Sequence, residues 1–144
     1  MLYQIQQGEY IISTDRRKLN IEVIHGYLKN AYWSKNKPKA LVQKSIKGSI
    51  CFGVYHNKQQ VGFARVITDL TTFGYLADVF IVPDYQGKGL GKLLIKTIME
   101  CPDLQGFRGW SLATRDAHGL YAKYGFRELE NPKIWMRKAI FSEY

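Results

Sequence analysis

The chain has 144 residues, of which 46% are hydrophobic and 23% charged, a balance typical of one folded domain and not of a disordered chain. Its formal net charge of +9 attracts polyanions, so nucleic acid, an anionic membrane surface and a phosphate-rich ligand all fit the charge. There is no run of about 18 apolar residues and no secretory pattern at the N-terminus, so we expect a cytoplasmic protein without a membrane partner. Cys51 and Cys101 lack Cys or His neighbours at metal-ligand spacing, which predicts buried thiols and no metal site.

The first part of the chain predicts a strand followed by two helices. The strand covers residues 9–13. Asn20 has the chemistry of a helix N-cap, and Pro38 suits the first turn of a second helix. The loop between the helices, residues 30–37, carries aromatic side chains. Apolar residues at helical spacing predict the buried faces: Ile21, Ile24 and Leu28 in the first helix, and Leu41, Val42 and Ile46 in the second.

Three consecutive strands are predicted next, at residues 49–56, 61–68 and 73–82. The end of the third is apolar on both faces, as in a central strand, and Pro83 ends it because proline donates no ladder hydrogen bond. A helix follows, with Leu90, Leu93, Leu94 and Ile98 on one face, and Pro102 ends it.

The last part predicts a strand at residues 107–114, a helix at 117–124 ended by Gly125, and closing strands at 126–129 and 134–139. The element order is β-α-α-β-β-β-α-β-α-β-β. This order predicts an α+β fold over a single domain, 1–144, with helices packed on the faces of a sheet.

A glycine-rich segment, Gln86-Gly87-Lys88-Gly89-Leu90-Gly91, lies between the predicted central strand and the amphipathic helix. Glycines let the backbone approach a ligand closely, and free N–H groups at a helix start favour an anion such as a pyrophosphate. Lys88 and Lys92 add positive charge. The P-loop pattern is absent, and the spacing differs from the dinucleotide fingerprint. A glycine turn without a ligand is the remaining alternative on these six residues alone.

Two motifs resemble those of the GNAT superfamily. The stretch Val82-Pro83-Asp84-Tyr85-Gln86-Gly87-Lys88-Gly89-Leu90-Gly91 resembles its acetyl-CoA signature, and Leu120-Tyr121-Ala122-Lys123-Tyr124-Gly125-Phe126 resembles its later L-Y-x-x-x-G-F motif. Tyr85 departs from the pattern where arginine is common, but this leaves the backbone cradle intact. The resemblance implies an N-acetyltransferase that uses acetyl-CoA, on a central, mixed, mostly antiparallel sheet of six or seven strands with about four helices on its faces.

The resemblance also implies the layout of the site. A bulge near Phe80 would open a split between two parallel strands, and pantetheine would pair there with the backbone of Phe80 and Val82. Tyr121 would protonate the leaving thiolate; the alternative for Tyr121 is a core tyrosine. The residues expected to bind the co-substrate are Phe80, Ile81, Val82, Gln86, Gly87, Lys88, Gly89, Leu90, Gly91, Lys92, Asp116 and Tyr121.

The family's usual route is direct attack of a neutral amine on the thioester in a ternary complex, which needs a base and a donor to the carbonyl. The backbone N–H of Val82 or a neighbour is the expected donor. Asp78 is a carboxylate on a buried strand and is a candidate to hold or deprotonate the amine, the alternative being an ion pair with Arg65. Asp116 with His118 is a second candidate base, the alternative being an N-cap.

Substrate specificity is expected from residues 27–39 and 68–73, where Tyr32 and Trp33 would form a wall. The basic charge favours a neutral or acidic small amine, or a protein N-terminus, over a strongly cationic acceptor. The acceptor and the preferred acyl length stay open. Terminal strands would support a homodimer, with Ile134-Trp135-Met136 as an apolar edge. The alternative functions are a catalytically inactive acyl-CoA-binding module and a nucleic-acid-binding module.

Overall fold

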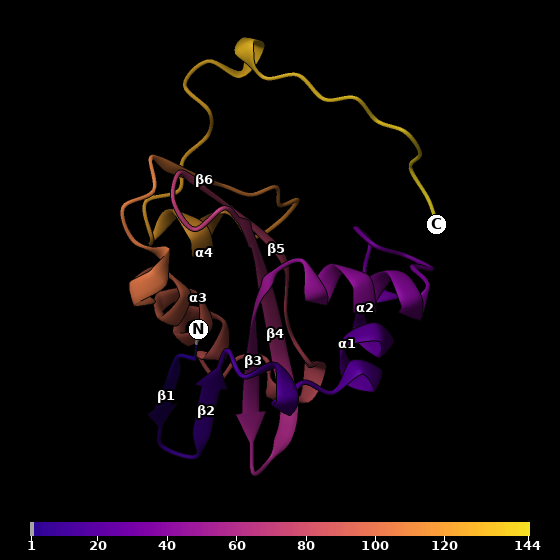
Figure 1. Ribbon diagram of the computed structural model, residues 1–144, viewed down its shortest axis with the longest axis vertical. Helices are drawn as coiled ribbons and strands as arrows, with labels where there is room; N and C mark the ends of the chain where they lie inside the picture. The colour runs from indigo at the N-terminus through magenta and orange to yellow at the C-terminus, as the bar shows by residue number, and fades with distance from the viewer. Residues whose placement is uncertain (1) are drawn as a thin grey trace.

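The computed structural model describes residues 2–144 and contains one six-stranded sheet in the order β1-β2-β3-β4-β5-β6 (Figure 1). Neighbouring strands are antiparallel, except that β5 and β6 are parallel. The predicted mixed, mostly antiparallel sheet is confirmed. The strands are β1 (Gln4–Gln7), β2 (Tyr10–Ser13), β3 (Ile50–His56), β4 (Gln59–Thr68), β5 (Phe73–Ile81) and β6 (Gly109–Ser111).

Four α-helices cover the two faces of the sheet, α1 and α2 on one side and α3 and α4 on the other (Figure 1). The predicted cap of α1 is confirmed, because the Asn20 side chain accepts hydrogen bonds from the backbone N–H groups of Glu22 and Val23. The helices are α1 (Ile21–Leu28), α2 (Lys39–Lys47), α3 (Leu90–Glu100) and α4 (His118–Ala122), and the 3-10 turns are η1 (Arg16–Lys18), η2 (Pro83–Tyr85), η3 (Pro102–Leu104) and η4 (Pro132–Ile134).

Each face of the sheet has its own apolar core. Leu94 and Ile98 of α3 are fully buried on one face, while Ile24 of α1 packs with Phe63 and Phe80 on the other. Burial of each such side chain contributes about 1.5–3 kcal/mol. Both cysteines are free and buried, as predicted. The prediction that Leu41 lies on the buried face of α2 is wrong. Leu41 is 42% exposed, because Val42 supplies the buried contact of this helix.

A bulge interrupts the β4–β5 ladder before the end of β5. Phe63 pairs with Phe80, whereas Arg65 pairs with Ala77, so Ala64 opposes two residues of β5, Asp78 and Val79. Asp78 takes a left-handed backbone conformation with φ 54°. The extra residue reverses the face of the sheet to which the later side chains of β5 point. Leu76 therefore packs in the α3 core, whereas Phe80 packs in the α1–α2 core.

Two predictions of strands at the ends of the chain need correction. The strand expected at residues 9–13 is the second arm of a hairpin, because Gly8, with φ 59°, turns the chain back onto β1. The closing strands expected at 126–129 and 134–139 do not form. That segment runs extended across the top of the molecule toward α2 (Figure 1), and Ile134 and Met136 are 71% and 96% exposed. A strand needs a partner edge and a buried face, and this segment has neither.

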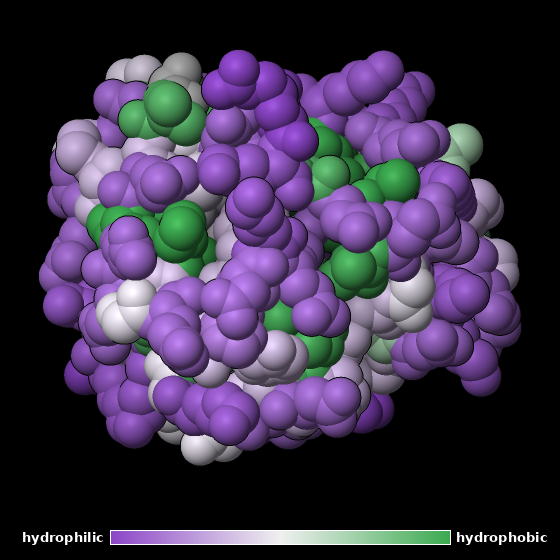
Figure 2. All heavy atoms as spheres, turned by 90° about the horizontal axis from the view of Figure 1, so that it is seen from below, coloured by the Kyte–Doolittle hydropathy of each residue, from purple (hydrophilic) through white to green (hydrophobic). Residues whose placement is uncertain are grey.

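On the face seen in Figure 2, hydrophilic side chains surround separate apolar patches instead of one continuous apolar area. Within residues 2–144, no helix has the length and apolar character needed to cross a bilayer.

Candidate active site

A cleft of about 650 Å³ lies where β5 and β6 separate. The two strands pair only from Phe73 to Tyr75 of β5, so the rest of β5 has no partner on that side. Leu76 to Val79 line one wall of the cleft, the segment that follows β6 lines the other, and the α1–α2 loop covers one end. The split implied by the resemblance is therefore present, and it reaches from the α1–α2 side of the sheet to α4.

The glycine-rich loop ends at the N-terminus of α3. Gly87 and Gly89 have φ values of 78° and 79°, which strongly favour glycine. Gly89 is the N-cap and gives no side-chain hydrogen bond, so the first N–H groups of α3 are left to a ligand or water. A side chain at either glycine would meet no atom within 4 Å, which shows open space over the loop. Lys88 and Lys92 are exposed beside it, and the arrangement fits a phosphate-bearing ligand.

The end of β5 differs from the expected pairing. The backbone N–H of Val82 donates to the Val61 carbonyl at 2.9 Å, so of the expected donors, Val82 or a neighbour, only a neighbour is left to serve a ligand. In a strand, the backbone N–H and C=O groups of successive residues point alternately to the two neighbouring strands. The N–H and C=O of Phe80 therefore face β4, like those of Val82, whereas the N–H of Ile81 faces the split. The Ile81 carbonyl accepts a hydrogen bond of 2.9 Å from the Gln86 side chain, which ties the glycine-rich loop to the strand.

Tyr121 lies on α4 and lines the cleft. Only 8% of the residue is exposed, and its ring packs edge-on against Phe126, with 6.0 Å between ring centroids. Burial raises the pKa of Tyr121 to about 12. The phenol therefore keeps its proton at neutral pH. Tyr121 belongs to the apolar core and also lines the cleft, so the core alternative is confirmed and the catalytic role stays a prediction.

Asp78 lies in the bulge and lines the same cleft. Its Oδ2 accepts a hydrogen bond of 2.5 Å from Arg65 Nε, and its Oδ1 accepts one of 2.8 Å from Trp33 Nε1. Arg65 also donates to Ser49 Oγ at 3.1 Å. The ion pair with Arg65 is thus present, and it anchors the α1–α2 loop through Trp33.

The second pair of candidate bases is divided by the structure. Asp116 is exposed and lines the cleft, whereas His118 is exposed outside it. The N-cap alternative for Asp116 is wrong: the N-cap of α4 is Ala117, and its N–H donates to Thr114 Oγ1 at 3.1 Å. Asp116 therefore lies one position too early to cap the helix.

The α1–α2 loop reaches across the cleft. Tyr32 Oη accepts a hydrogen bond of 3.0 Å from the backbone N–H of Arg115, whose guanidinium lies 3.8 Å from the centroid of the same ring. Trp33 stands nearly perpendicular to Tyr32. Four further residues line the cleft, and none of them belongs to a local motif that sequence analysis could use: Lys37, Arg115, Arg137 and Tyr144. Residues 68–73, expected to set specificity, do not line it.

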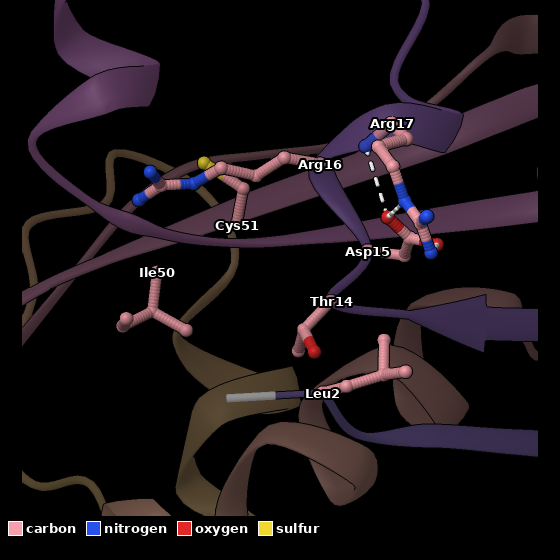
Figure 3. Close-up of a pocket in the computed structure, with 7 residues that line it drawn as sticks. All are labelled: Leu2, Thr14, Asp15, Arg16, Arg17, Ile50 and Cys51. Atoms are coloured by element: carbon pink, nitrogen blue, oxygen red, sulfur yellow. Dashed lines mark hydrogen bonds and ion pairs between the residues drawn. The ribbon is translucent and has the colours of Figure 1, made fainter.

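A second cavity, of about 430 Å³, does not have the properties of an active site (Figure 3). Arg17 holds the Asp15 carboxylate, and burial raises the pKa of the Cys51 thiol to about 11, so neither a free acid nor a reactive thiolate is present. Within residues 2–144, no group of three His, Cys, Asp or Glu side chains could hold a metal ion. The cavity is lined by Leu2, Thr14, Asp15, Arg16, Arg17, Ile50 and Cys51.

Comparison with known proteins agrees with this geometry. Residues 47–128 match the family model described as an acetyltransferase (GNAT) domain. A protein from Gibberella zeae named as an acetyltransferase, FG08082, is 33% identical to this chain, and the match covers 81% of this chain and 78% of that protein. The chain therefore belongs to the GNAT acetyltransferase family and is an acyltransferase.

Solved structures support the assignment of the fold. The crystal structure of a protein from Xanthomonas campestris pv. campestris, described as belonging to the GNAT family, has a TM-score of 0.90 and 46% identity, covering 94% of this chain and 96% of that one. A Staphylococcus aureus protein of unknown function, SA2161, has a TM-score of 0.74 at 21% identity, covering 92% and 99% of the two chains. The second likeness concerns the fold alone.

Proposed function

We propose that this chain is a single N-acetyltransferase domain, 1–144, that moves an acetyl group from acetyl-CoA to a primary amine of a small molecule, a peptide or a protein. The observation that carries the proposal is the position of the glycine-rich loop, with open space over Gly87 and Gly89, at the N-terminus of α3 and beside the β5–β6 split. Free N–H groups at such a helix start bind pyrophosphate, and Lys88 and Lys92 add charge. Members of the family generally use acetyl-CoA.

The remaining expected contacts follow the chain from this loop to the cleft. Gln86 holds the loop against the end of β5. Leu90 is buried and anchors the first turn of α3, and Gly91 follows it in the same turn. Ile81, between Phe80 and Val82, presents its backbone N–H to the split beside this path. Tyr121 and Asp116 line the far end of the path.

Acetyl-CoA supplies a thioester that a neutral amine attacks directly in a ternary complex, with CoA leaving as the thiolate. We assign to Tyr121 the proton that the sulfur receives, because its phenol is neutral at physiological pH and lies in the cleft. The Ile81 N–H, which faces the split, is the donor that we assign to the thioester carbonyl in place of Val82.

Both carboxylates of the cleft act on the amine in this proposal. Asp78 already accepts one hydrogen bond on each oxygen, so we assign it the role of orienting the amine with its remaining lone pairs. Asp116 is exposed in the cleft, and we assign it the removal of the ammonium proton through water. The test is thiol release from acetyl-CoA with a panel of primary amines: amine-dependent release supports the proposal, and binding without release by any amine points to the inactive acyl-CoA-binding alternative.

We also propose that the protein forms a homodimer through its C-terminal segment, residues 127–144. Ile134, Trp135, Met136 and Phe141 are all more than half exposed in an extended chain, and a second copy would cover them. Light scattering after size exclusion tests this proposal. A dimer that becomes a monomer when Trp135 and Met136 are both changed to Ser supports it, and a monomeric wild-type protein contradicts it. We place the protein in the cytoplasm and expect no nucleic-acid partner.

A further inference from the structure

The cleft is rich in positive charge. Four cationic side chains line the cleft, from four different parts of the chain: Lys37, Arg65, Arg115 and Arg137. Only two side-chain carboxylates, those of Asp78 and Asp116, line it with them. Of the cations, Arg65 is paired with Asp78. Within residues 2–144, no carboxylate forms an ion pair with Lys37, Arg115 or Arg137, so three cations remain against one free carboxylate.

Lys37 is placed in the cleft by the backbone of its loop. Asn36, with φ 64°, turns the chain, and the His25 ring contacts the Lys37 carbonyl at 3.0 Å. The side chain is half-buried, with its ammonium 5.6 Å from the Tyr144 ring centroid. Burial lowers the pKa of Lys37, and the attraction of Asp78 offsets this only in part, because the ammonium has no directly paired carboxylate as a partner. A bound anion would supply that partner.

Arg115 approaches the cleft from the other wall, in the segment between β6 and α4. Its guanidinium lies 3.8 Å from the Tyr32 ring centroid, and its own backbone N–H donates to the hydroxyl of that ring. This double contact fixes the residue while leaving its N–H donors unpaired by any carboxylate. A planar guanidinium held in this way can donate two parallel hydrogen bonds to a carboxylate or a phosphate.

These cations are separate from those expected to bind the phosphates of acetyl-CoA. None of residues 83–92, which include Lys88 and Lys92, lines this cleft. The cleft contains Asp78 and Tyr121, so it is the part of the molecule where the acceptor would meet the thioester. Its positive charge is therefore available to the acceptor.

We infer that the acceptor amine carries an anionic group, a carboxylate or a phosphate, which Lys37 and Arg115 bind while Trp33 and Tyr32 enclose the rest of the molecule. This inference rests on the proposed acetyltransferase function and narrows its substrate class. An acceptor with two or more positive charges is disfavoured, because only Asp116 has an unpaired carboxylate there.

The experiment compares amines in matched pairs that differ in the anionic group. β-Alanine against β-alaninamide tests a carboxylate, and phosphoethanolamine against ethanolamine tests a phosphate. We expect kcat/KM for thiol release to be at least about tenfold higher for the anionic member of one pair or both. The pair with the larger preference shows whether the cleft favours a carboxylate or a phosphate. Taking each ratio in wild type and in a variant cancels differences between the amino groups themselves.

Lys37→Gln and Arg115→Gln should each lower that preference at least about threefold, with the dissociation constant for acetyl-CoA unchanged. Lys96→Gln, which removes an exposed lysine on α3 outside the cleft, should leave the preference unchanged. Equal or better use of the neutral amines, or a preference that survives both cleft substitutions, would overturn the inference.

Binding provides a readout without turnover. The protein saturated with CoA is titrated with the same four amines while the indole N–H resonance of Trp33 is followed by NMR, since this group donates to Asp78 inside the cleft. Saturable shifts with the anionic amines alone are expected, and their absence, together with no charge preference in turnover, overturns the inference. A protein that binds acetyl-CoA and acetylates amines without regard to charge refutes this inference alone. A protein that does not bind acetyl-CoA refutes the proposed function.

Discussion

Trp33 and Asp78 are 45 residues apart in the chain and are joined by a hydrogen bond of 2.8 Å from the indole Nε1 to the carboxylate Oδ1. Trp33 belongs to the α1–α2 loop, whereas Asp78 lies in the bulge of β5. The other oxygen of Asp78 is paired with Arg65 on β4. One buried carboxylate therefore joins the loop, the bulge and the neighbouring strand, and it holds together the acceptor side of the cleft.

Asp78→Ala should lower the free energy of unfolding by about 3–5 kcal/mol, because it leaves the Arg65 guanidinium buried without a carboxylate partner. The side chains of Arg65 and Asp78 are only 13% and 5% exposed. Urea unfolding of the purified proteins measures the change. Glu100→Gln is the control, because its pair with Lys96 is exposed, and we expect a change of at most about 0.5 kcal/mol. Similar values for the two variants would contradict the role of the buried pair.

Tyr121→Phe should lower kcat by at least about 100-fold and leave the affinity for acetyl-CoA within about twofold, since only the proton donor is removed. Stopped assays of thiol release give kcat, and calorimetry gives the affinity. Tyr124→Phe is a suitable control, because its hydroxyl donates to the Lys92 carbonyl at 2.9 Å and does not line the cleft. An unchanged kcat in Tyr121→Phe would remove the residue from the mechanism.

The pH dependence of kcat tests the same residue. A proton donor acts in its neutral form, and burial raises the pKa of Tyr121 from 10.0 to about 12, so the neutral form persists to higher pH than in a free phenol. We therefore expect no decline of kcat with saturating substrates up to about pH 10. A decline with an apparent pKa below about 10 that disappears in Tyr121→Phe would show that the phenol ionises too early for this account.

Gly89→Val should reduce acetyl-CoA affinity at least about tenfold. A residue with a Cβ at φ 79° loses about 1–2 kcal/mol in that conformation, and the side chain would project into the space over the loop. Gly26→Ala in α1 is the control, because a side chain there also meets no atom within 4 Å and its φ is not positive. Affinity should be unchanged in the control. Equal affinities in both variants would show that the loop does not contact the ligand.

Much of the fold could be predicted because local patterns and tertiary contacts agree. Asn20 caps α1 as its chemistry indicates, and Pro102 lies just beyond the end of α3. Only the resemblance implied the bulge, because one extra residue in an apolar strand does not change the residue pattern from which a strand is predicted. Asp78 shows the difficulty: the sequence offered its ion pair with Arg65 as an alternative, but not its left-handed backbone or its hydrogen bond to Trp33.

The C-terminal strands illustrate the opposite case. Residues 134–139 have strand-like composition, but a strand also needs a free edge alongside, and the chain does not return to β6. Local sequence patterns could not predict the residues on the acceptor side of the cleft either. Lys37, Arg115 and Arg137 come from three separate segments that only the folded chain brings to one cleft.

Calorimetric titration of the purified protein with acetyl-CoA tests the central claim most directly. We predict saturable binding of one acetyl-CoA per chain with a dissociation constant in the micromolar range, weakened in Gly89→Val and retained in Gly26→Ala. No binding at millimolar acetyl-CoA by a protein that is folded by circular dichroism would contradict the account, because the glycine-rich loop at the start of α3 would then have no co-substrate to hold.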